Sequence, residues 1–439
     1  MTAREAEIIE LIRKEVKPAL GCTEPIAVAL AVAKAMEIIE SRCTVPAGWR
    51  MGDGFTLDIR VSGNILKNGM GVGIPGTGMV GLHIASALGA VCGKSEYGLE
   101  VLHDLDEASI ARAKELVEKE AVGIGIADTD HKLYVKADVC MDGHRAYAVI
   151  EDDHDNIVET GFDAEVITDC HKTSDAPSTD QKSTVDYHLT VKEIFDFASG
   201  VAFEDISFIL ESRTLNLALA HEGLRGRYGL RVGHAISLEC NKEVFGSDFL
   251  SYAMALTAAA SDARMAGCTL PAMSNSGSGN QGITVTMPVI AYSMRYGTSD
   301  EQLARALVLS HLIAIHIKGY LGKLSALCGC VIASTGSACG LVYLRGGDYV
   351  QVCSAIKNMI GNITGMVCDG AKVGCAMKVA SGVSSALQSA VLAREDLCIS
   401  EHDGIIEKDI EKTIRNLGRI GSVGMQTTDN MILDIMVCK

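Results

Sequence analysis

Four cysteines in the C-terminal third of the chain have spacings that suit metal chemistry. Two of them enclose the run Cys368-Asp-Gly-Ala-Lys-Val-Gly-Cys375, and two stand earlier as Cys328 and Cys330 in Ala-Leu-Cys-Gly-Cys-Val. Thiolates are the protein ligands of iron–sulfur clusters, and glycines between them let backbone N–H groups approach the sulfurs. The spacing matches neither common ferredoxin pattern, and free cysteines are also frequent in apolar cores. The thiols therefore indicate either a cluster site or packed core side chains.

A fifth cysteine stands where a helix is expected to begin. Cys22 lies in Gly21-Cys-Thr-Glu-Pro25, directly before an apolar run over 26–39 that is typical of a helix. The positive end of a helix and its free amides lower a thiol pKa, and the thiolate can act as a base or nucleophile. Glu24 opposes this effect because it is negative. A reactive thiol and an inert buried one fit the local sequence equally well.

A loop of small residues precedes another apolar helix. It reads Ser274-Asn-Ser-Gly-Ser-Gly-Asn-Gln-Gly282. Amides at the start of a helix bind anions such as a carboxylate or a phosphate. The loop also resembles the phosphate cradle of pyridoxal-phosphate enzymes of the serine/threonine dehydratase type. The nearest upstream lysine, Lys242, does not match their Schiff-base site. An anion-binding loop and an ordinary loop both fit the pattern.

The composition limits the class of protein. The chain has 439 residues, 48% of them hydrophobic, which predicts two or three domains. Its formal net charge of −16 argues against a nucleic-acid partner. Fifteen cysteines in a long chain with a charged N-terminal sequence predict free thiols or metal ligands in a reducing cytoplasm. No uninterrupted apolar run reaches the roughly 18 residues of a membrane span, so no membrane partner is expected.

The pattern of elements predicts an α+β protein with a large all-helical domain. Residues 1–46 form N-terminal helices that we expect to pack on that domain, and residues 47–180 form a smaller inserted α+β domain. The strand-like runs are 55–61, 122–127, 132–139 and 144–150, and the polar run 171–186 is expected to be a linker. Residues 181–439 form the helical domain. Its long small-residue helices are predicted at 249–267, 283–296, 301–320, 324–345, 349–363 and 375–395.

Four motifs in order resemble those of the L-cysteine desulfidases, which are relatives of the iron–sulfur L-serine dehydratase alpha chain. The resemblance covers nearly the whole chain. The motifs lie at 17–25, 67–76, 322–330 and 364–375. The resemblance implies a 4Fe–4S cluster held by three cysteines, with one iron left open. The serine dehydratases differ in having wider cysteine spacing where Cys368 and Cys375 stand.

The resemblance also implies roles for individual residues. The cluster ligands would be Cys328, Cys368 and Cys375, although the Gly-Cys pairing of the dehydratases points to Cys330 instead of Cys328. Cys438 could reach a cluster only through a mobile tail. Cys22 matches the proposed proton acceptor of the desulfidases. The residues implied in substrate binding are Thr23, Asn275, Ser276, Gly277, Ser278 and Asn280.

The implied activity is β-elimination from a small L-amino acid. L-Cysteine would give pyruvate, ammonia and hydrogen sulfide, and L-serine dehydration is the near alternative. A pyridoxal-phosphate lyase and a non-enzymatic iron–sulfur sensor are the more distant alternatives. The expected partner is the small-molecule amino acid, and a homo-oligomer is possible.

Overall fold

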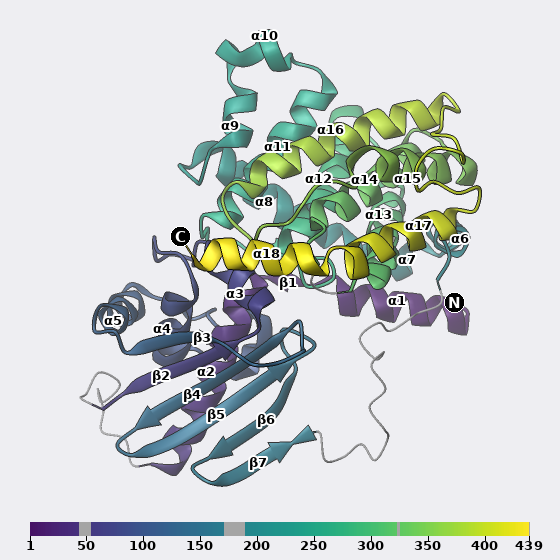
Figure 1. Ribbon diagram of the computed structural model, residues 1–439. Coiled ribbons are helices and arrows are strands. Elements are labelled where there is room, and N and C mark those ends of the chain that lie inside the picture. Colours follow the sequence, from purple (N-terminus) through teal and green to yellow (C-terminus); the bar gives the residue numbers. More distant parts are fainter. Residues whose placement is uncertain (44–53, 171–188, 323–324, 439) are drawn as a thin grey trace.

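The computed structural model describes residues 1–43, 54–170, 189–322 and 325–438. It shows a body of helices beside a sheet that is backed by helices (Figure 1). The predicted α+β class is confirmed. The predicted linker at 171–186 lies outside the described residues, and the division into domains stays a prediction.

The helical half has a core of Ala, Val, Ile and Leu side chains with little or no exposure. Helices that are apolar on most faces pack in this way because each is surrounded by others. The predicted long helices are confirmed, with shifts at their ends. The helices of this half are α1 (Ala3–Glu15), α6 (Val191–Gly200), α7 (Phe203–Ile206), α8 (Glu211–Arg225), α9 (Val232–Ser237), α10 (Lys242–Phe245), α11 (Phe249–Met265), α12 (Gly279–Tyr296), α13 (Asp300–Leu321), α14 (Gly329–Leu344), α15 (Tyr349–Ile363), α16 (Cys375–Arg394) and α17 (Ile410–Arg419).

The α+β half is built on a six-stranded sheet of order β3-β2-β4-β5-β6-β7. Strands β2 and β3 are parallel and the other neighbours are antiparallel. Strand β2 buries Leu57, Ile59 and Val61 and exposes the residues between them, which is the period of two expected for a sheet with one covered face. The elements are β2 (Thr56–Val61), α3 (Gly63–Gly69), α4 (Leu82–Cys92), α5 (Glu107–Glu118), β3 (Val122–Ile126), β4 (Tyr134–Met141), β5 (His144–Glu151), β6 (Ile157–Phe162) and β7 (Glu165–Asp169).

Helix α2 (Thr23–Arg42) corrects one expectation. The sequence predicts that both N-terminal helices pack on the helical half, but only α1 belongs to that core. Helix α2 contacts β4, β5 and α4 and lies in the core of the α+β half. Its residues 27–33 have no more than 1% exposure. Such an all-round apolar helix needs partners on every side, and the sheet and α4 together supply them.

Two small elements join the halves. Strand β1 (Pro18–Ala19) pairs with β8 (Ala272–Met273), which ties the α1–α2 connection to the loop before α12. Helix α18 (Gln426–Val437) runs along the junction and contacts α3 (Figure 1). Within the described residues, none of the helices is both long enough and apolar enough to cross a membrane.

Candidate active site

A cavity of about 800 Å³, counting the space at its mouth, lies where the two halves meet. Four long helices, α2, α12, α14 and α16, begin at its wall, so their positive ends and free amides converge there. Of the residues predicted from sequence, it is lined by Cys22, Thr23, Ser278, Asn280, Cys328, Cys368 and Cys375. Further lining residues include Glu24, Asn68, Arg264, Gln281, Lys318, Cys330 and Lys378. A cavity with convergent helix ends is suited to a ligand that carries negative charge.

The short β1–β8 pair sets the start of α2 against the small-residue loop. The amide of Ser274 donates to the carbonyl oxygen of Lys17 at 2.8 Å, and the Ser274 hydroxyl donates to the same oxygen at 2.6 Å. Thr23 Oγ1 in turn donates to the carbonyl oxygen of Gly277 at 2.7 Å. Gly277 has a φ of +75°, a value that favours glycine. The loop therefore holds Cys22 and Thr23 at one side of the cavity.

Cys22 is the N-cap of α2 and is 5% exposed. Its thiol donates to Glu24 Oε2 at 3.2 Å. Burial and the negative charge of Glu24 raise the pKa of Cys22 above its ordinary value, and Arg264 opposes this only in part. Of the two alternatives that the sequence left open, the lowered pKa is not found, because burial and then Glu24 act to raise it.

Glu24 and Arg264 place opposite charges beside Cys22. Burial acts to raise the pKa of Glu24, but His154, the Cys22 thiol and Arg264 together hold it below its usual range, so Glu24 is a carboxylate. Arg264 is 3% exposed and donates to the carbonyl oxygen of Gly21 at 2.9 Å and to Asn280 Oδ1 at 3.4 Å. A Cβ on Gly279 would lie 2.2 Å from Arg264 Nε, so a side chain there would force the guanidinium to move.

The opposite wall carries the cysteines of the two C-terminal motifs. An isolated bridge pairs Leu327 with Val367, and the amide of Cys368 donates to the carbonyl oxygen of Ala326 at 2.7 Å. This pairing places Cys328 and Cys368 side by side. The hydrogen bond from the Cys328 thiol lowers the pKa of Cys368, and the same bond raises the pKa of Cys328.

The other two thiols of this wall differ in their surroundings. Cys375 begins α16, and its pKa is raised by burial. Cys330 Sγ contacts the carbonyl oxygen of Lys378 at 3.1 Å, and burial raises its pKa to about 12. The sulfur of Cys330 is thus directed at the backbone of α16, whereas the sulfurs of Cys328 and Cys368 contact each other.

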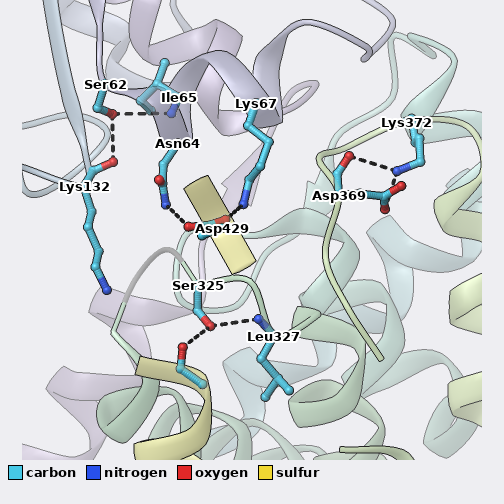
Figure 2. Close-up of polar contacts among 11 residues, drawn as sticks. Ser62, Asn64, Ile65, Lys67, Lys132, Ser325, Leu327, Asp369, Lys372 and Asp429 are labelled. Atoms are coloured by element: carbon cyan, nitrogen blue, oxygen red, sulfur yellow. Dashed lines mark hydrogen bonds and ion pairs between the residues drawn. The ribbon is translucent and has the colours of Figure 1, made fainter. Parts of the chain in front are cut away.

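Lysines surround the thiol wall. Lys378 Nζ donates to the carbonyl oxygen of Val367 at 2.8 Å and pairs with Asp369. Lys67 is 1% exposed and pairs with Asp429 of α18. Figure 2 shows Lys67 and Asn64 converging on Asp429 from α3. Lys67 and Lys378 both contribute to the lowered pKa of Cys368, so Cys368 is biased towards the thiolate, whereas the pKa values of Cys328, Cys330 and Cys375 are raised.

Lys318 of α13 also lines the cavity. Burial lowers its pKa to about 8, while Cys368, Glu24 and Cys328 oppose that shift. Its amine can therefore exchange a proton near neutral pH, which makes it a candidate for acid–base work.

The donor atoms of this wall suit one kind of metal centre better than another. Across residues 1–43, 54–170, 189–322 and 325–438, no three His, Cys, Asp or Glu side chains converge as the ligands of a single metal ion would. An iron–sulfur cluster differs because each iron takes its own sulfur ligand, so its cysteines stand around a larger body. The wall offers thiols, lysine charges and two helix starts, which fit an anionic, sulfur-ligated group in their chemistry.

Some predicted residues lie behind the cavity or away from it. Asn275, Ser276 and Gly277 support the lining residues from behind. Cys438 ends α18 as an exposed residue outside the lining. Among the lining residues, Arg264, Lys318 and Lys378 were not predicted, and Asn68 and Gln281 lie in predicted motifs but were given no role of their own. A lone arginine in the Ala-rich run of α11 was a usable signal, because a charge on a buried helix requires a partner.

The chain is similar to known proteins over nearly its full length. Residues 96–434 match the family model described as serine dehydratase alpha chain. A UPF0597 protein of Phocaeicola vulgatus is 48% identical over 435 residues, which cover 99% of this chain and 97% of that protein. A UPF0597 protein of Parabacteroides distasonis is 46% identical over 438 residues, covering 100% and 99%. One of Oleidesulfovibrio alaskensis is 48% identical over 431 residues, covering 98% and 97%.

Proposed function

The chain belongs to the serine dehydratase alpha chain family, and from that premise we propose that it is an iron–sulfur lyase that converts L-cysteine to pyruvate, ammonia and hydrogen sulfide. Family membership supports a dehydratase-like lyase. The observation that carries the finer proposal is that Cys22 and the thiols of Cys328, Cys368 and Cys375 line one cavity from opposite sides.

Cys328, Cys368 and Cys375 would hold a 4Fe–4S cluster. The contact between Cys328 and Cys368 favours Cys328 over Cys330 as the upstream ligand, because the sulfur of Cys330 is engaged by the backbone of α16. When bound, the cluster would supply an open iron that acts as a Lewis acid towards the substrate carboxylate and leaving group. Such a cluster suits a reducing compartment, and we propose a cytoplasmic location.

Cys22 would remove the proton from Cα of the amino acid. Only the thiolate can accept that proton, so the thiol would first lose its own proton to solvent; the raised pKa keeps the thiolate fraction small but makes each thiolate a stronger base. The hydrogen bond to Glu24 holds the protonated sulfur in a fixed position beforehand. Lys318 would give a proton to the departing sulfur, since a group with a pKa of about 8 is protonated at neutral pH. Cleavage of the Cβ–S bond then leaves an aminoacrylate, which water converts to pyruvate and ammonia.

The loop before α12 would orient the substrate. Thr23, Ser278 and Asn280 line the cavity and would contact the amino acid directly. Asn275, Ser276 and Gly277 would hold those residues in place. Arg264 adds a fixed positive charge for the carboxylate. A substrate held in this way reacts faster because its orientation is set on binding.

An anaerobic assay of sulfide and pyruvate release from L-cysteine beside L-serine tests the proposal. We expect both products from L-cysteine, and an absorption shoulder that bleaches in air. Pyruvate from L-serine alone would make the protein a serine dehydratase. A Schiff-base absorption band would indicate a pyridoxal-phosphate lyase. Iron absorption without any product would indicate a sensor.

A further inference from the structure

Three polar side chains form a buried hydrogen-bonded network behind the cavity. Asn275 Nδ2 lies 2.9 Å from His311 Nδ1 and 3.3 Å from the carbonyl oxygen of His311. Gln281 Nε2 lies 2.6 Å from Asn275 Oδ1. Asn275 and His311 have no exposure and Gln281 has 2%. Only Gln281 of the three lines the cavity.

A backbone carbonyl oxygen fixes the direction of the hydrogen bonds in this network. A carbonyl oxygen only accepts, so the group of Asn275 that faces His311 must be the amide nitrogen. Asn275 Oδ1 then faces Gln281 and the Ser276 hydroxyl, and of the two polar atoms of the Gln281 amide it can accept only from the nitrogen. Burial lowers the pKa of His311 to about 3, so its ring is neutral and its Nδ1 is free to accept. Rotation of either amide would place two acceptors or two donors together.

The consequence is a buried acceptor whose orientation is set. Gln281 Oε1 has no hydrogen-bond partner among the described residues. It faces Gly329, where an added Cβ would lie 3.3 Å from it, beside the start of α14. A buried polar atom without a partner is costly, and such atoms normally have one. His311 Nε2 is also without a partner, but it does not line the cavity.

We propose that Gln281 Oε1 accepts a hydrogen bond from the α-ammonium of the amino acid, with Asn275 and His311 as positioning residues. The inference rests on the proposed function and adds the group that selects amino acids over acids without the amine. An acceptor-only oxygen requires a donor, and of the charged groups on an amino acid only the ammonium donates. Arg264, on the same cavity, is suited to the carboxylate at the other end of the zwitterion.

The test compares L-alanine with propanoate, which differ only by the amine. Neither has a group that can leave from Cβ, so binding is measured by anaerobic calorimetry on the iron-loaded protein without turnover. We expect wild type to prefer L-alanine. Gln281→Met keeps the volume but removes the acceptor, and it should weaken L-alanine binding by roughly 10- to 150-fold, the factor for losing a hydrogen bond to a charged group. Propanoate binding should stay within about twofold.

Two further variants sharpen the result. His311→Phe removes the acceptor that fixes Asn275, and it should lower the preference for L-alanine by a smaller factor. His316→Gln is the matched control, because His316 is a buried histidine of the same helix that contacts Glu411 and does not line the cavity. This variant should bind L-alanine and propanoate with the affinities of the wild type. If the methionine variant does not fold, Gln281→Asn replaces it. This substitution shortens the side chain by one methylene, so the amide oxygen is withdrawn from the ligand and L-alanine binding should weaken.

The outcomes separate this inference from the proposed function. Equal loss of L-alanine and propanoate binding in Gln281→Met would overturn the inference, since it would indicate a packing defect. A wild type without preference for L-alanine would overturn it even if L-cysteine were turned over. Selective loss in a protein without lyase activity would keep the inference and overturn the proposed function.

Discussion

Cysteines face the cavity from two sides, and their surroundings differ in charge. Cys22 contacts a carboxylate, and burial and Glu24 raise its pKa. Cys368 receives a hydrogen bond from a neighbouring thiol, and Lys67 and Lys378 help to lower its pKa. Cys22 therefore holds its proton, whereas Cys368 is the thiol of the opposite side that releases its proton most readily, since the hydrogen bond to Cys368 and burial raise the pKa of Cys328, and burial raises that of Cys375.

The difference suggests a division of work between the two sides. A metal ligand must be deprotonated at neutral pH, and nearby lysines favour that state. A base that removes a weakly acidic proton gains strength from a high pKa. Under the proposed function, these environments would suit Cys368 to the ligand role and Cys22 to the base role, and each prediction below tests one side against the other.

The largest effect is expected on the thiol wall. Cys368→Ser and Cys375→Ser should each abolish the colour, the bound iron and the turnover, because a hydroxyl does not replace a thiolate in holding the cluster. Iron is measured per mole of protein after anaerobic purification. Cys398→Ser is the control, since Cys398 is exposed and does not line the cavity. Near-normal iron in either cavity variant would remove that residue from the ligand set.

The second prediction separates two neighbours on that wall. Cys328→Ala should lose the cluster, because its sulfur contacts Cys368. Cys330→Ala should keep most of the iron, because its sulfur is directed at the carbonyl oxygen of Lys378. The measurements are the iron content and the visible spectrum of the two variants. Loss of iron in Cys330→Ala and its retention in Cys328→Ala would identify Cys330 as the upstream ligand.

The third prediction concerns the opposite side. Cys22→Ala should keep the iron and lower turnover by at least roughly 10²-fold, the scale of losing a general base. Cys339→Ala removes an equally buried sulfur from α14 outside the cavity, and it should cost stability but not turnover. Turnover is expressed per mole of cluster under anaerobic conditions. Equal values for wild type and Cys22→Ala would make Cys22 a packing residue.

The sequence predicted much of the site because its motifs are local. The start of α2 and the loop before α12 each hold their candidate residues within a few positions of a helix start. Arg264 and Lys318 were not predicted, because each reaches the cavity from a part of a helix that carries no motif, and Gln281, although it lies in the predicted loop, was given no role of its own. Their role depends on which helices meet, and that is a tertiary property.

The fold was likewise predictable only where the signal is local in the sequence. The long helices were predicted because small apolar residues persist over many turns. Helix α14 begins at Gly329, later than the predicted 324, because Ala326 and Leu327 pair with the segment before Cys368. Strands β6 and β7 were missed because short polar turns interrupt a weak alternation. The partner of α2 could not be derived, since an apolar helix fits either core.

The smallest expected effect is on the pKa of Cys22 itself. Glu24→Gln removes a negative charge that stabilises the protonated thiol, so the pKa of Cys22 should fall. Alkylation proceeds through the thiolate. The pH at which the Cys22 peptide is half-maximally alkylated, followed by mass spectrometry, should therefore move to lower pH. Because Cys22 holds its proton at neutral pH, each unit of lost pKa should raise the thiolate fraction about tenfold and weaken the thiolate as a base about threefold at a Brønsted slope near 0.5, so turnover should rise by about threefold per unit.

A second carboxylate on the same helix supplies the control. Glu37 lies near the other end of α2, where it accepts hydrogen bonds from Ser95, and Glu37→Gln makes the same change of charge. Because charges separated by more than about 10 Å are largely screened in salt, this variant should leave the Cys22 profile unchanged. If the pH of half-maximal alkylation fell equally in both variants, the change would come from the net charge of the protein and not from the contact between Glu24 and Cys22. Coincident profiles for Glu24→Gln and wild type would show that the carboxylate does not set the basicity of Cys22, and the contrast between the two sides of the cavity would then rest on burial.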